Sequence, residues 1–467
     1  MKKQVLSALA FCSALGIAQA QTDVTKEYLV NPSFETLKAA DGTTDVAVKT
    51  KLENGLYGWE ISKLLDNQFS NYQVESEASG SSTGIPANGI IKPSQGEFYY
   101  FNRQGWGNVD GSELKTSTSK NLPIGTYYAV IDYKAADFSN NNDASKSGTT
   151  IGIKAENATN ELLGENTAVR RAYSTLTSNS DPYMVNAAWN ELGTMFTVTE
   201  PTTVTISLVQ NMKNSGRSDI AWDNLRLYKI EDVSENAPMD VSGLITTSNY
   251  YAFGGWNIEG GNTFQVNTWS TEGENDGSGM TTPFIEDHVG KENKAANATI
   301  SHTVSHLIPG IYEVSGLIRV LNEAGGDTPS GATLYANEGS TNACNGEPCT
   351  NGVYGTYIVK GTVGTDGVLT FGIKVANANF NWVSFKNFKL QYLGAASIEQ
   401  LQATLQEKIE EAKAYAENCP KGIAAIVNAA ITQGDNAQPT EESLNAAIAA
   451  LTQAIALAEE TAPATEA

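Results

Sequence analysis

The chain has few cationic residues and few residues of the kinds that hold zinc. Its 467 residues include only four cysteines and three histidines, and 30 lysines and arginines stand against 52 aspartates and glutamates. Such an acidic excess repels phosphate backbones, so nucleic acid is not an expected partner. His302 and His306 lie four residues apart on a predicted strand, roughly 13 Å from each other, which is too far for one zinc ion. We expect both at the surface or at a sheet edge.

Two sequence signatures of catalysis are also absent. The chain contains no HExxH pair and no P-loop. A glycosidase needs two carboxyls at a defined separation across one bond, and the sequence alone cannot locate such a pair among 52 acids. We therefore expect a protein that is not an enzyme, with a hydrolase that uses an unrecognised carboxylate pair as an alternative.

The first 20 residues have the pattern of a secretory signal peptide. Lys2 and Lys3 precede an apolar run from Val5 to Ile17 that is too short to span a bilayer, and Ala18-Gln19-Ala20 offers the small residues that signal peptidase needs. The alternative is a lipoprotein modified at Cys12, although the residue before it is bulky. Cleavage removes two lysines and leaves a net charge of −24. We expect a secreted protein with no integral membrane segment.

The remaining cysteines suggest one disulfide. Cys344 and Cys349 lie five residues apart in a loop rich in Gly and Asn, close enough to pair in an oxidising compartment. Reduced thiols are the alternative. Zinc is not expected, because no further Cys or His accompanies the pair.

Most of the chain shows the patterning of β-sandwiches. From residue 28 to 230, short runs rich in Val, Ile, Thr and Tyr are separated by clusters of Gly, Asn, Pro and Ser. Leu122-Pro123-Ile124-Gly125 forms a turn before one such run, and Leu307-Ile308-Pro309-Gly310 repeats that turn about 180 residues later. The chain is therefore predicted to be mainly β, with two tandem jelly-roll sandwiches.

The strands that close the two copies support the repeat. When Asn224 is matched with Asn387, Leu225 and Leu227 align with Phe388 and Leu390, which share one face of a strand. Those apolar residues are expected in the core. On the opposite face, Arg226 is expected to stay in water.

After residue 393 the apolar residues recur at helical spacing, which predicts three short amphipathic helices. Pro420, Gly434 and Pro439 mark their breaks, and Thr440 is the expected N-cap of the last helix. The predicted organisation is a signal peptide (1–20), a first sandwich (21–232), a linker (233–247), a second sandwich (248–394), a three-helix bundle (395–460) and a tail (461–467).

Several motifs carry a resemblance. Asn31-Pro32-Ser33-Phe34-Glu35, Trp59 after Gly58, and Trp222-Asp223-Asn224-Leu225 resemble the galactose-binding-like jelly-roll superfamily, to which many carbohydrate-binding modules belong. Residues 266–273, 279–284, 298–302 and 380–387 resemble a sandwich module that recurs in secreted Bacteroidetes proteins, often beside glycoside hydrolase domains. The helices are similar to small modules of bacterial surface and glycan-degrading proteins.

The resemblance implies a structural calcium ion in the first sandwich. Family members often hold one with the acid of the opening motif and the Asp near the close, which correspond here to Glu35 and Asp223. The alternative is that both acids are surface charges or cap backbone amides. In the second sandwich Lys386 stands where Asp223 would be, so no calcium is expected there.

Aromatic residues are the candidate ligand contacts, because sugar rings present apolar faces that stack on aromatic rings while polar side chains bind the hydroxyls. The segment from residue 99 to 106 is densest in them. Tyr99 and Tyr100 point to opposite faces of an extended chain, so at least one of them is expected in the core. The candidate residues are Tyr99, Tyr100, Arg103, Trp106, Trp189, Trp269 and Trp382.

The function expected from the sequence is glycan or polysaccharide binding by a secreted, non-catalytic protein. Two weak sites on one chain would raise avidity for a polymer. The alternative is a structural or adhesive surface protein that contacts other proteins, and the helical bundle is a possible place for such a partner.

Overall fold

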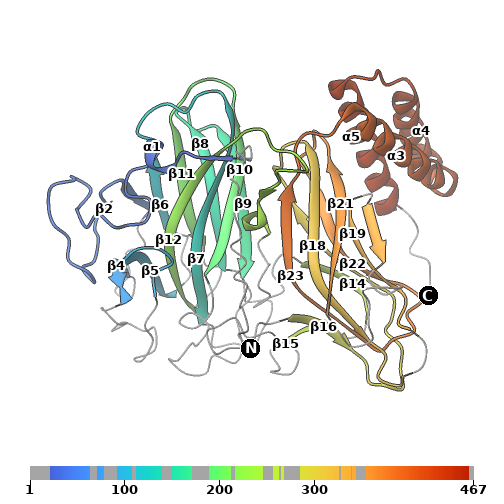
Figure 1. The fold of residues 1–467 in the computed structure, drawn as a ribbon, viewed down its shortest axis with the longest axis horizontal. Coiled ribbons are helices and arrows are strands. Elements are labelled where there is room, and N and C mark those ends of the chain that lie inside the picture. The colour runs from blue at the N-terminus through green and yellow to red at the C-terminus, as the bar shows by residue number, and fades with distance from the viewer. Residues whose placement is uncertain are drawn as a thin grey trace, which may run out of the picture.

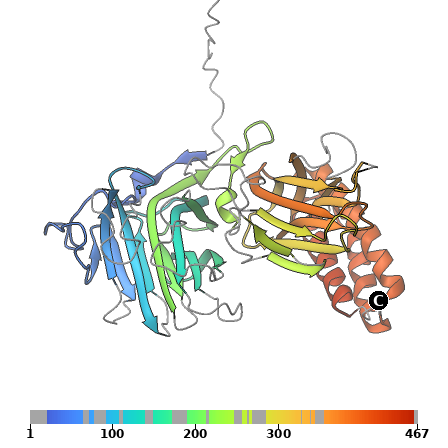
Figure 2. The same ribbon diagram turned by 90° about the horizontal axis from the view of Figure 1, so that it is seen from below.

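The computed structural model describes residues 21–63, 71–77, 92–107, 112–138, 149–170, 189–211, 216–245, 256–261, 264–267, 284–325, 328–337, 339–342 and 354–461. They form two antiparallel β-sandwiches followed by three helices, which confirms the predicted fold class (Figure 1). Sandwich 2 lies between sandwich 1 and the helices in both views (Figure 2). The predicted signal peptide and disulfide, Cys344 with Cys349, lie outside the described residues, as does Trp269.

Sandwich 1 consists of two six-stranded sheets. The first has the order β10-β7-β12-β5-β4, with β1 paired to β12. Its strands are β1 (Gln21–Asp23), β4 (Asn71–Ser76), β5 (Phe98–Gly107), β7 (Gly125–Phe138), β10 (Asn190–Val198) and β12 (Gly216–Ile230). The second has the order β2-β3-β6-β11-β8-β9. Its strands are β2 (Gly55–Leu56), β3 (Trp59–Lys63), β6 (Ser112–Ser117), β8 (Thr149–Asn157), β9 (Leu162–Arg170) and β11 (Val204–Asn211), and the short helix α1 (Thr25–Tyr28) follows β1.

Sandwich 2 repeats this topology, except that the described residues of its second sheet include no counterpart of β2. One sheet has the order β15-β16-β23-β18-β21, with β13 paired to β23, and the other has the order β14-β17-β22-β19-β20. The strands of the first are β13 (Met239–Asp240), β15 (Phe264–Asn267), β16 (Phe284–His288), β18 (Gly310–Leu321), β21 (Gly355–Val363) and β23 (Trp382–Tyr392). Those of the second are β14 (Trp256–Gly260), β17 (Ala298–Val304), β19 (Ala332–Ala336), β20 (Gly339–Asn342) and β22 (Leu369–Val375).

Details of the closing strands confirm the alignment that the sequence suggested. Asn224 in β12 and Asn387 in β23 both adopt the left-handed conformation, with φ of 54° and 53°. Each lies where the strand pairing, of β12 with β7 and of β23 with β18, shifts register. Asn tolerates this conformation better than most residues. The hydroxyls of Tyr127 and Tyr312 each donate to the carbonyl four residues earlier, at 2.9 Å. The two sandwiches therefore share local devices as well as topology.

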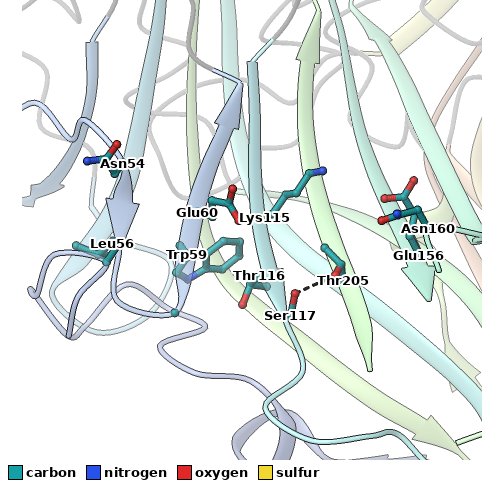
Figure 3. A pocket seen from close by; sticks show the side chains of 12 residues that line it. Asn54, Leu56, Trp59, Glu60, Lys115, Thr116, Ser117, Glu156, Asn160 and Thr205 are labelled. Atoms are coloured by element: carbon teal, nitrogen blue, oxygen red, sulfur yellow. Dashed lines mark hydrogen bonds between the residues drawn. The ribbon is translucent and has the colours of Figure 1, made fainter. Parts of the chain in front are cut away.

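One segment of sandwich 1, residues 37–58, extends along the edge of its second sheet beside β3. The side chain of Asn31 donates to the carbonyls of Thr36 and Tyr57, and Lys38 pairs with Asp45, so the segment is held at both ends. Its end forms β2, and together with β3, β6, β11 and the end of β8 it encloses a groove on the outer surface of the sheet (Figure 3).

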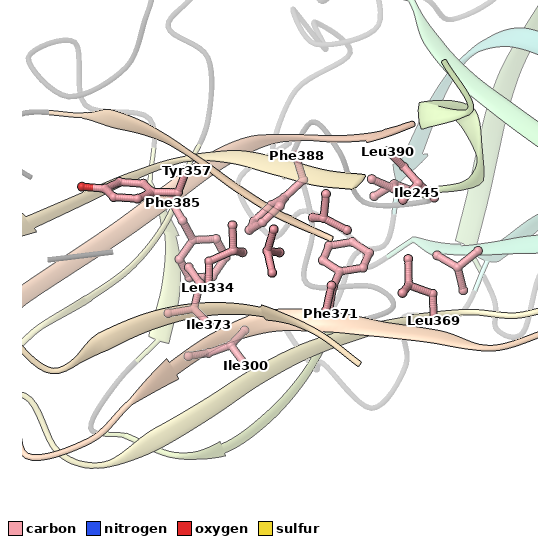
Figure 4. Close-up of a cluster of buried hydrophobic side chains, with 14 of the residues drawn as sticks. Ile245, Ile300, Leu334, Tyr357, Leu369, Phe371, Ile373, Phe385, Phe388 and Leu390 are labelled. Atoms are coloured by element: carbon pink, nitrogen blue, oxygen red, sulfur yellow. The ribbon is translucent and has the colours of Figure 1, made fainter. Parts of the chain in front are cut away.

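Each sandwich has its own apolar core, as the alternation predicted. Leu225 and Leu227 are fully buried in sandwich 1, and Phe388 and Leu390 are buried in sandwich 2 (Figure 4). Arg226 is half-buried, because it pairs with Asp132 at 2.5 Å and with Glu191 at 2.9 Å, so the expectation that it stays in water is wrong.

His302 also departs from its predicted place. It is 3% exposed and packs against Trp256 and Phe371, with ring centroids 5.5 Å away in both cases. Both rings come from the strands that flank β17 in the same sheet, β14 and β22, and with them His302 is buried inside the sandwich. His306 is exposed, as expected.

The predicted linker is a packed structural element. Met239, Val241, Leu244 and Ile245 are buried in one apolar cluster that joins both sandwiches, and β13 extends the sheet of β23. The 3-10 helix η3 (Ser242–Leu244) lies within this segment, and Figure 4 shows Ile245 beside Leu390. Across the interface, the Tyr312 hydroxyl lies 3.6 Å from the sulfur of Met195. The two sandwiches are therefore held in a fixed orientation.

The helices α3 (Ile398–Asn418), α4 (Lys421–Asp435) and α5 (Glu441–Thr461) pack around their own apolar core, as predicted. Ser397 and Gln400 form a capping box at the start of α3, and the Thr440 hydroxyl accepts from the amide of Ser443. The bundle contacts sandwich 2, where Thr404 and Thr362 are hydrogen-bonded at 3.1 Å. None of the described helices is long and apolar enough to cross a membrane.

Candidate functional site

One sheet of each sandwich carries polar and aromatic side chains on the face that points away from its core. Along β12, Ile220 and Trp222 belong to the core, so Ala221 and Asp223 lie on the opposite face. The strand register extends this face across β4, β5, β7 and the residue before β10. We call it polar face 1, defined by Gln73, Glu75, Tyr99, Lys134 and Trp189.

The residues of polar face 1 contact one another. The Tyr99 hydroxyl donates to Glu75 at 2.9 Å, and Gln73 donates to the other oxygen of that carboxylate. The ammonium of Lys134 lies 5.4 Å from the centre of the Trp189 ring, within the range of a cation–π contact. Tyr99 meets the same ring edge-on, with centroids 6.2 Å apart. A half-buried indole thus sits at the centre of the cluster.

Burial gives these groups an unusual electrostatic environment. Glu75 is fully buried and Lys134 is 5% exposed, although neither belongs to the apolar core. Burial, together with the charge of Glu75, raises the pKa of the Tyr99 hydroxyl well above its usual range, which keeps it a hydrogen-bond donor. Burying charged groups costs free energy, so a cluster of this kind is more often functional than structural.

Sandwich 2 has a corresponding polar face 2. It is defined by Glu286, His288, Arg319, Tyr354, Trp382, Ser384 and Lys386, which lie on β16, β18, β23 and just before β21. The Arg319 guanidinium carbon lies 4.1 Å from the centre of the Trp382 ring and 5.6 Å from that of Tyr354. Lys386 lies 4.6 Å from the Tyr354 ring. Two buried cations therefore share the Tyr354 ring, and Arg319 contacts Trp382 as well.

Hydrogen bonds fix the orientation of the aromatic groups on polar face 2. The Trp382 indole donates to Glu286 at 2.8 Å, and the Tyr354 hydroxyl donates to Ser384 at 3.0 Å. His288 lies 4.5 Å from the Trp382 ring, and its Nε2 is 2.9 Å from the carboxylate of Glu323. That contact lowers the pKa of Glu323, while burial lowers the pKa of Arg319. The arrangement is rigid before any ligand binds.

The two polar faces match by register. Lys134 pairs with Ala221, and Arg319 pairs with Ser384, and both partners lie three residues before the left-handed Asn of their closing strand. Trp189 directly precedes β10, as Tyr354 directly precedes β21. Each sandwich thus places a cation, from β7 or β18, against an aromatic ring that directly precedes the neighbouring edge strand, β10 or β21.

The structure sorts the predicted ligand residues. Tyr99 and Trp189 meet on polar face 1, and Trp382 lies on polar face 2. Tyr100 is 2% exposed and stacks on Phe34 in the core, so the prediction that it contacts a ligand is corrected. The alternation of side chains along β5 explains the difference.

Two further candidates are placed only by their backbone. Arg103 lies in β5, where it pairs with Asn71 and Asp219, and Trp106 lies further along the same strand. Their side chains, and the whole of Trp269, lie outside the described residues.

Sequence reasoning did not identify Lys134, Arg319 or Tyr354. Lys134 follows Tyr133 in a run of apolar strand residues, and Arg319 stands between Ile318 and Val320. A single cation within such a run could have indicated the site. In a strand that turns one face to the core, the cation would lie on the opposite face.

Glu35 and Asp223, the predicted calcium ligands, hold the same short segment of chain. Asp223 accepts the amides of Ser94 and Gln95 at 2.8 and 3.0 Å, and Glu35 accepts those of Glu97 and Phe98. The groups that surround the two carboxylates are backbone N–H donors, which direct positive ends at them. Calcium would need further oxygen ligands at these positions, so this arrangement does not fit a cation. It fits the alternative of amide capping.

Asp223 is buried, and the charge of the nearby Asp132 adds to the effect of burial on the pKa of its carboxyl. Burial raises the pKa of its carboxyl to about 8, although the three amides that it accepts act in the opposite direction. No group of three or more metal-ligating side chains is present among the described residues. Calcium binding stays a prediction.

Comparisons with known proteins gave only distant likenesses. No family model and no curated protein matches the chain. Its fold is similar to TmCBM61, solved with β-1,4-galactotriose, at 15% identity over 43% of this chain and 97% of that one, with a TM-score of 0.24. It is also similar to the tandem CBM22 domains of Paenibacillus barcinonensis Xyn10C, at 9% identity over 81% and 99%, with a TM-score of 0.24.

The fold is similar to that of a cyclase to about the same degree. A cyclase from Fischerella sp. TAU matches at 12% identity over 43% of this chain and 94% of that one, with a TM-score of 0.26. Scores at this level carry no argument about ligands. The function has to be argued from the chain's own residues.

Proposed function

We propose that this protein is a secreted, non-catalytic carbohydrate-binding protein that holds a glycan at its two polar faces. The observation that carries the proposal is the repeated pairing of a buried cation with an aromatic ring, Lys134 with Trp189 and Arg319 with Tyr354. The cation stands at the same register in both sandwiches.

The chemistry of both faces suits sugars. The partly exposed rings of Trp189 and Tyr354 offer surfaces on which the apolar side of a pyranose stacks, and the carboxylates of Glu75 and Glu286 accept hydrogen bonds within the same clusters. Ligand sites of this type are largely preformed, with few polar groups fixed in orientation. The hydrogen bonds of Trp189 to the Lys92 carbonyl and of Trp382 to Glu286 provide that fixation.

The fixed orientation of the sandwiches supports bivalent binding. Because the segment from Met239 to Ile245 is buried between them, the two faces do not move independently. A polymer that reaches both sites loses less entropy at the second contact than it would with a flexible linker. Two weak sites then act as one stronger one.

A direct test uses the mature chain, residues 21–467. Binding to a glycan array and to insoluble polysaccharides is measured while the supernatant is assayed for released sugar. Binding without release supports the proposal. Binding with release would favour the hydrolase alternative, and retention of no glycan would favour a structural or adhesive role.

Variants connect the result to the site. Trp189→Ala and Tyr354→Ala are expected to weaken binding, whereas Ile124→Ala removes an apolar side chain that is 62% exposed in the turn before β7 and serves as control. Loss of binding in all three variants alike would point away from the polar faces.

A further inference from the structure

Sandwich 1 has a second concave surface on the sheet opposite to polar face 1. The groove has a volume of about 560 Å³, within the range of small-molecule sites. Its floor is formed by the outward side chains of β3, β6, β11 and β8, and the segment that ends in β2 forms one wall. Figure 3 shows Asn54 and Leu56 at one side and Glu156 and Asn160 at the other.

Strand register sets the size of the floor. Glu60 pairs with Lys115 across β3 and β6, and Ser117, Thr205 and Glu156 form the neighbouring row across β6, β11 and β8. From β3 to β8 the floor crosses three strand intervals, about 14 Å in all. That width exceeds a single hexose ring, so the groove has room for a short oligosaccharide.

The polar groups of the groove are largely unused. Within the described part of the chain, the side chains of Asn54, Glu60, Glu156 and Asn160 make no hydrogen bond to the protein. These amides and carboxylates are therefore free to bond the hydroxyls of a ligand.

The walls are set in place before binding. Asn160 adopts a left-handed conformation in the turn after β8, where the Asn157 side chain accepts the amides of Thr159 and Glu161. On the floor, Lys115 pairs with Glu113 at 3.2 Å, and Ser117 is hydrogen-bonded to Thr205 at 2.9 Å. Little ordering entropy remains to be lost when a ligand enters.

Charge selects the class of ligand. The lining contains two carboxylates, Glu60 and Glu156, against one ammonium, that of Lys115, and the mature chain carries a net charge of −24. An anionic sugar would be repelled, whereas the hydroxyls of a neutral sugar can donate to carboxylates and accept from amides and ammonium groups.

We propose that this groove is a second carbohydrate site, which takes a short neutral oligosaccharide between Glu60 and Glu156. It lies on the sheet opposite to polar face 1 and uses the segment before β3, so it does not depend on binding at the polar faces. A neutral glycan chain could thus be held on two separate surfaces of sandwich 1.

The test uses the full mature chain and three neutral probes, β-1,4-galactotriose, xylotriose and cellotriose, with trigalacturonate as the anionic comparison. Calorimetric titration measures affinity, and hydrogen exchange read by mass spectrometry locates protection. We expect one neutral trisaccharide to protect residues 54–60 and 113–117. We expect the Glu60→Gln/Glu156→Gln variant to bind it at least about tenfold more weakly, because hydrogen bonds to charged groups contribute on that scale.

Controls separate this site from the polar faces. Trp189→Ala should leave protection at residues 54–60 unchanged, and Glu53→Gln, an exposed carboxyl outside the groove, should leave the affinity unchanged. The proposal is overturned if none of the three neutral probes binds at millimolar concentration, or if the double variant binds as the parent does. Preferred binding of trigalacturonate would overturn the assigned ligand class.

Discussion

Lys134 on β7 and Arg319 on β18 occupy the same position in the two sandwiches, and each pairs with a residue that lies three positions before a left-handed Asn. Both are buried on the face away from the core and both contact aromatic rings. A charge buried in this way costs free energy, which a stabilising contact or a bound ligand has to offset.

Replacement of Arg319 by Met should separate the two roles. Burial disfavours the charged guanidinium, as the lowered pKa of Arg319 shows, so an apolar side chain of similar length removes a desolvation cost. We expect Arg319→Met to keep or raise the melting temperature while it weakens glycan binding. Thermal unfolding and titration with the glycan identified on the array would measure both. A large loss of stability with unchanged affinity would show that Arg319 is structural.

The packed linker should make the two sandwiches unfold together. Leu244 is 2% exposed within the shared apolar cluster, so Leu244→Asp should cost ~3–5 kcal/mol by burying an unpaired charge. Calorimetry should show the transitions of the two sandwiches separating in this variant. Ile124→Asp, at a site 62% exposed, is the matched control and should change little. Identical transitions in the parent and the Leu244 variant would argue against coupling.

Asp223 should make stability depend on pH. Its pKa rises from the ordinary value of 3.8 to about 8 in the folded state, so the folded protein binds a proton that the unfolded chain releases. Stability should therefore fall as the pH rises between these two values and change little above them. Asp223→Asn should flatten this slope in melting temperature against pH. Asp366→Asn, an exposed carboxyl of sandwich 2, should not.

Glu35 should stabilise sandwich 1 through backbone amides rather than through calcium. Glu35→Gln removes charge-assisted acceptors from the amides of Glu97 and Phe98 and should cost about 1–2 kcal/mol. We expect the same loss in calcium and in chelator. If chelator alone lowered the melting temperature of the parent and had no effect on the variant, the calcium prediction would hold instead.

Much of the fold could be predicted because the turn residues and the spacing of apolar residues indicate the same secondary structure in each segment. The repeated Pro and Gly turns, the alternation of apolar residues and the alignment of Asn224 with Asn387 were sufficient to predict two sandwiches. The helical spacing after residue 393 predicted the bundle, and Thr440 its last cap. The core positions of Leu225 and Leu227 followed from the same alternation.

The site was only partly predictable, because it depends on register between strands far apart in sequence. Tyr99 and Trp189 were candidates by residue type, but their contact requires β5 and β10 to belong to the same sheet. Lys134 had no signal beyond its place in an apolar run. Arg226 was expected in water, and only the pairing of β12 with β7 brings Asp132 beside it.

The measurement that tests the central claim most directly is the affinity of the mature chain and of the Trp189→Ala/Tyr354→Ala variant for the polysaccharide selected on the array. We expect each single variant to bind at least about tenfold more weakly, since loss of an aromatic anchor costs about 2 kcal/mol. The double variant should lose the avidity that two sites provide. Equal affinity of the parent and the double variant would contradict the assignment of glycan binding to the polar faces.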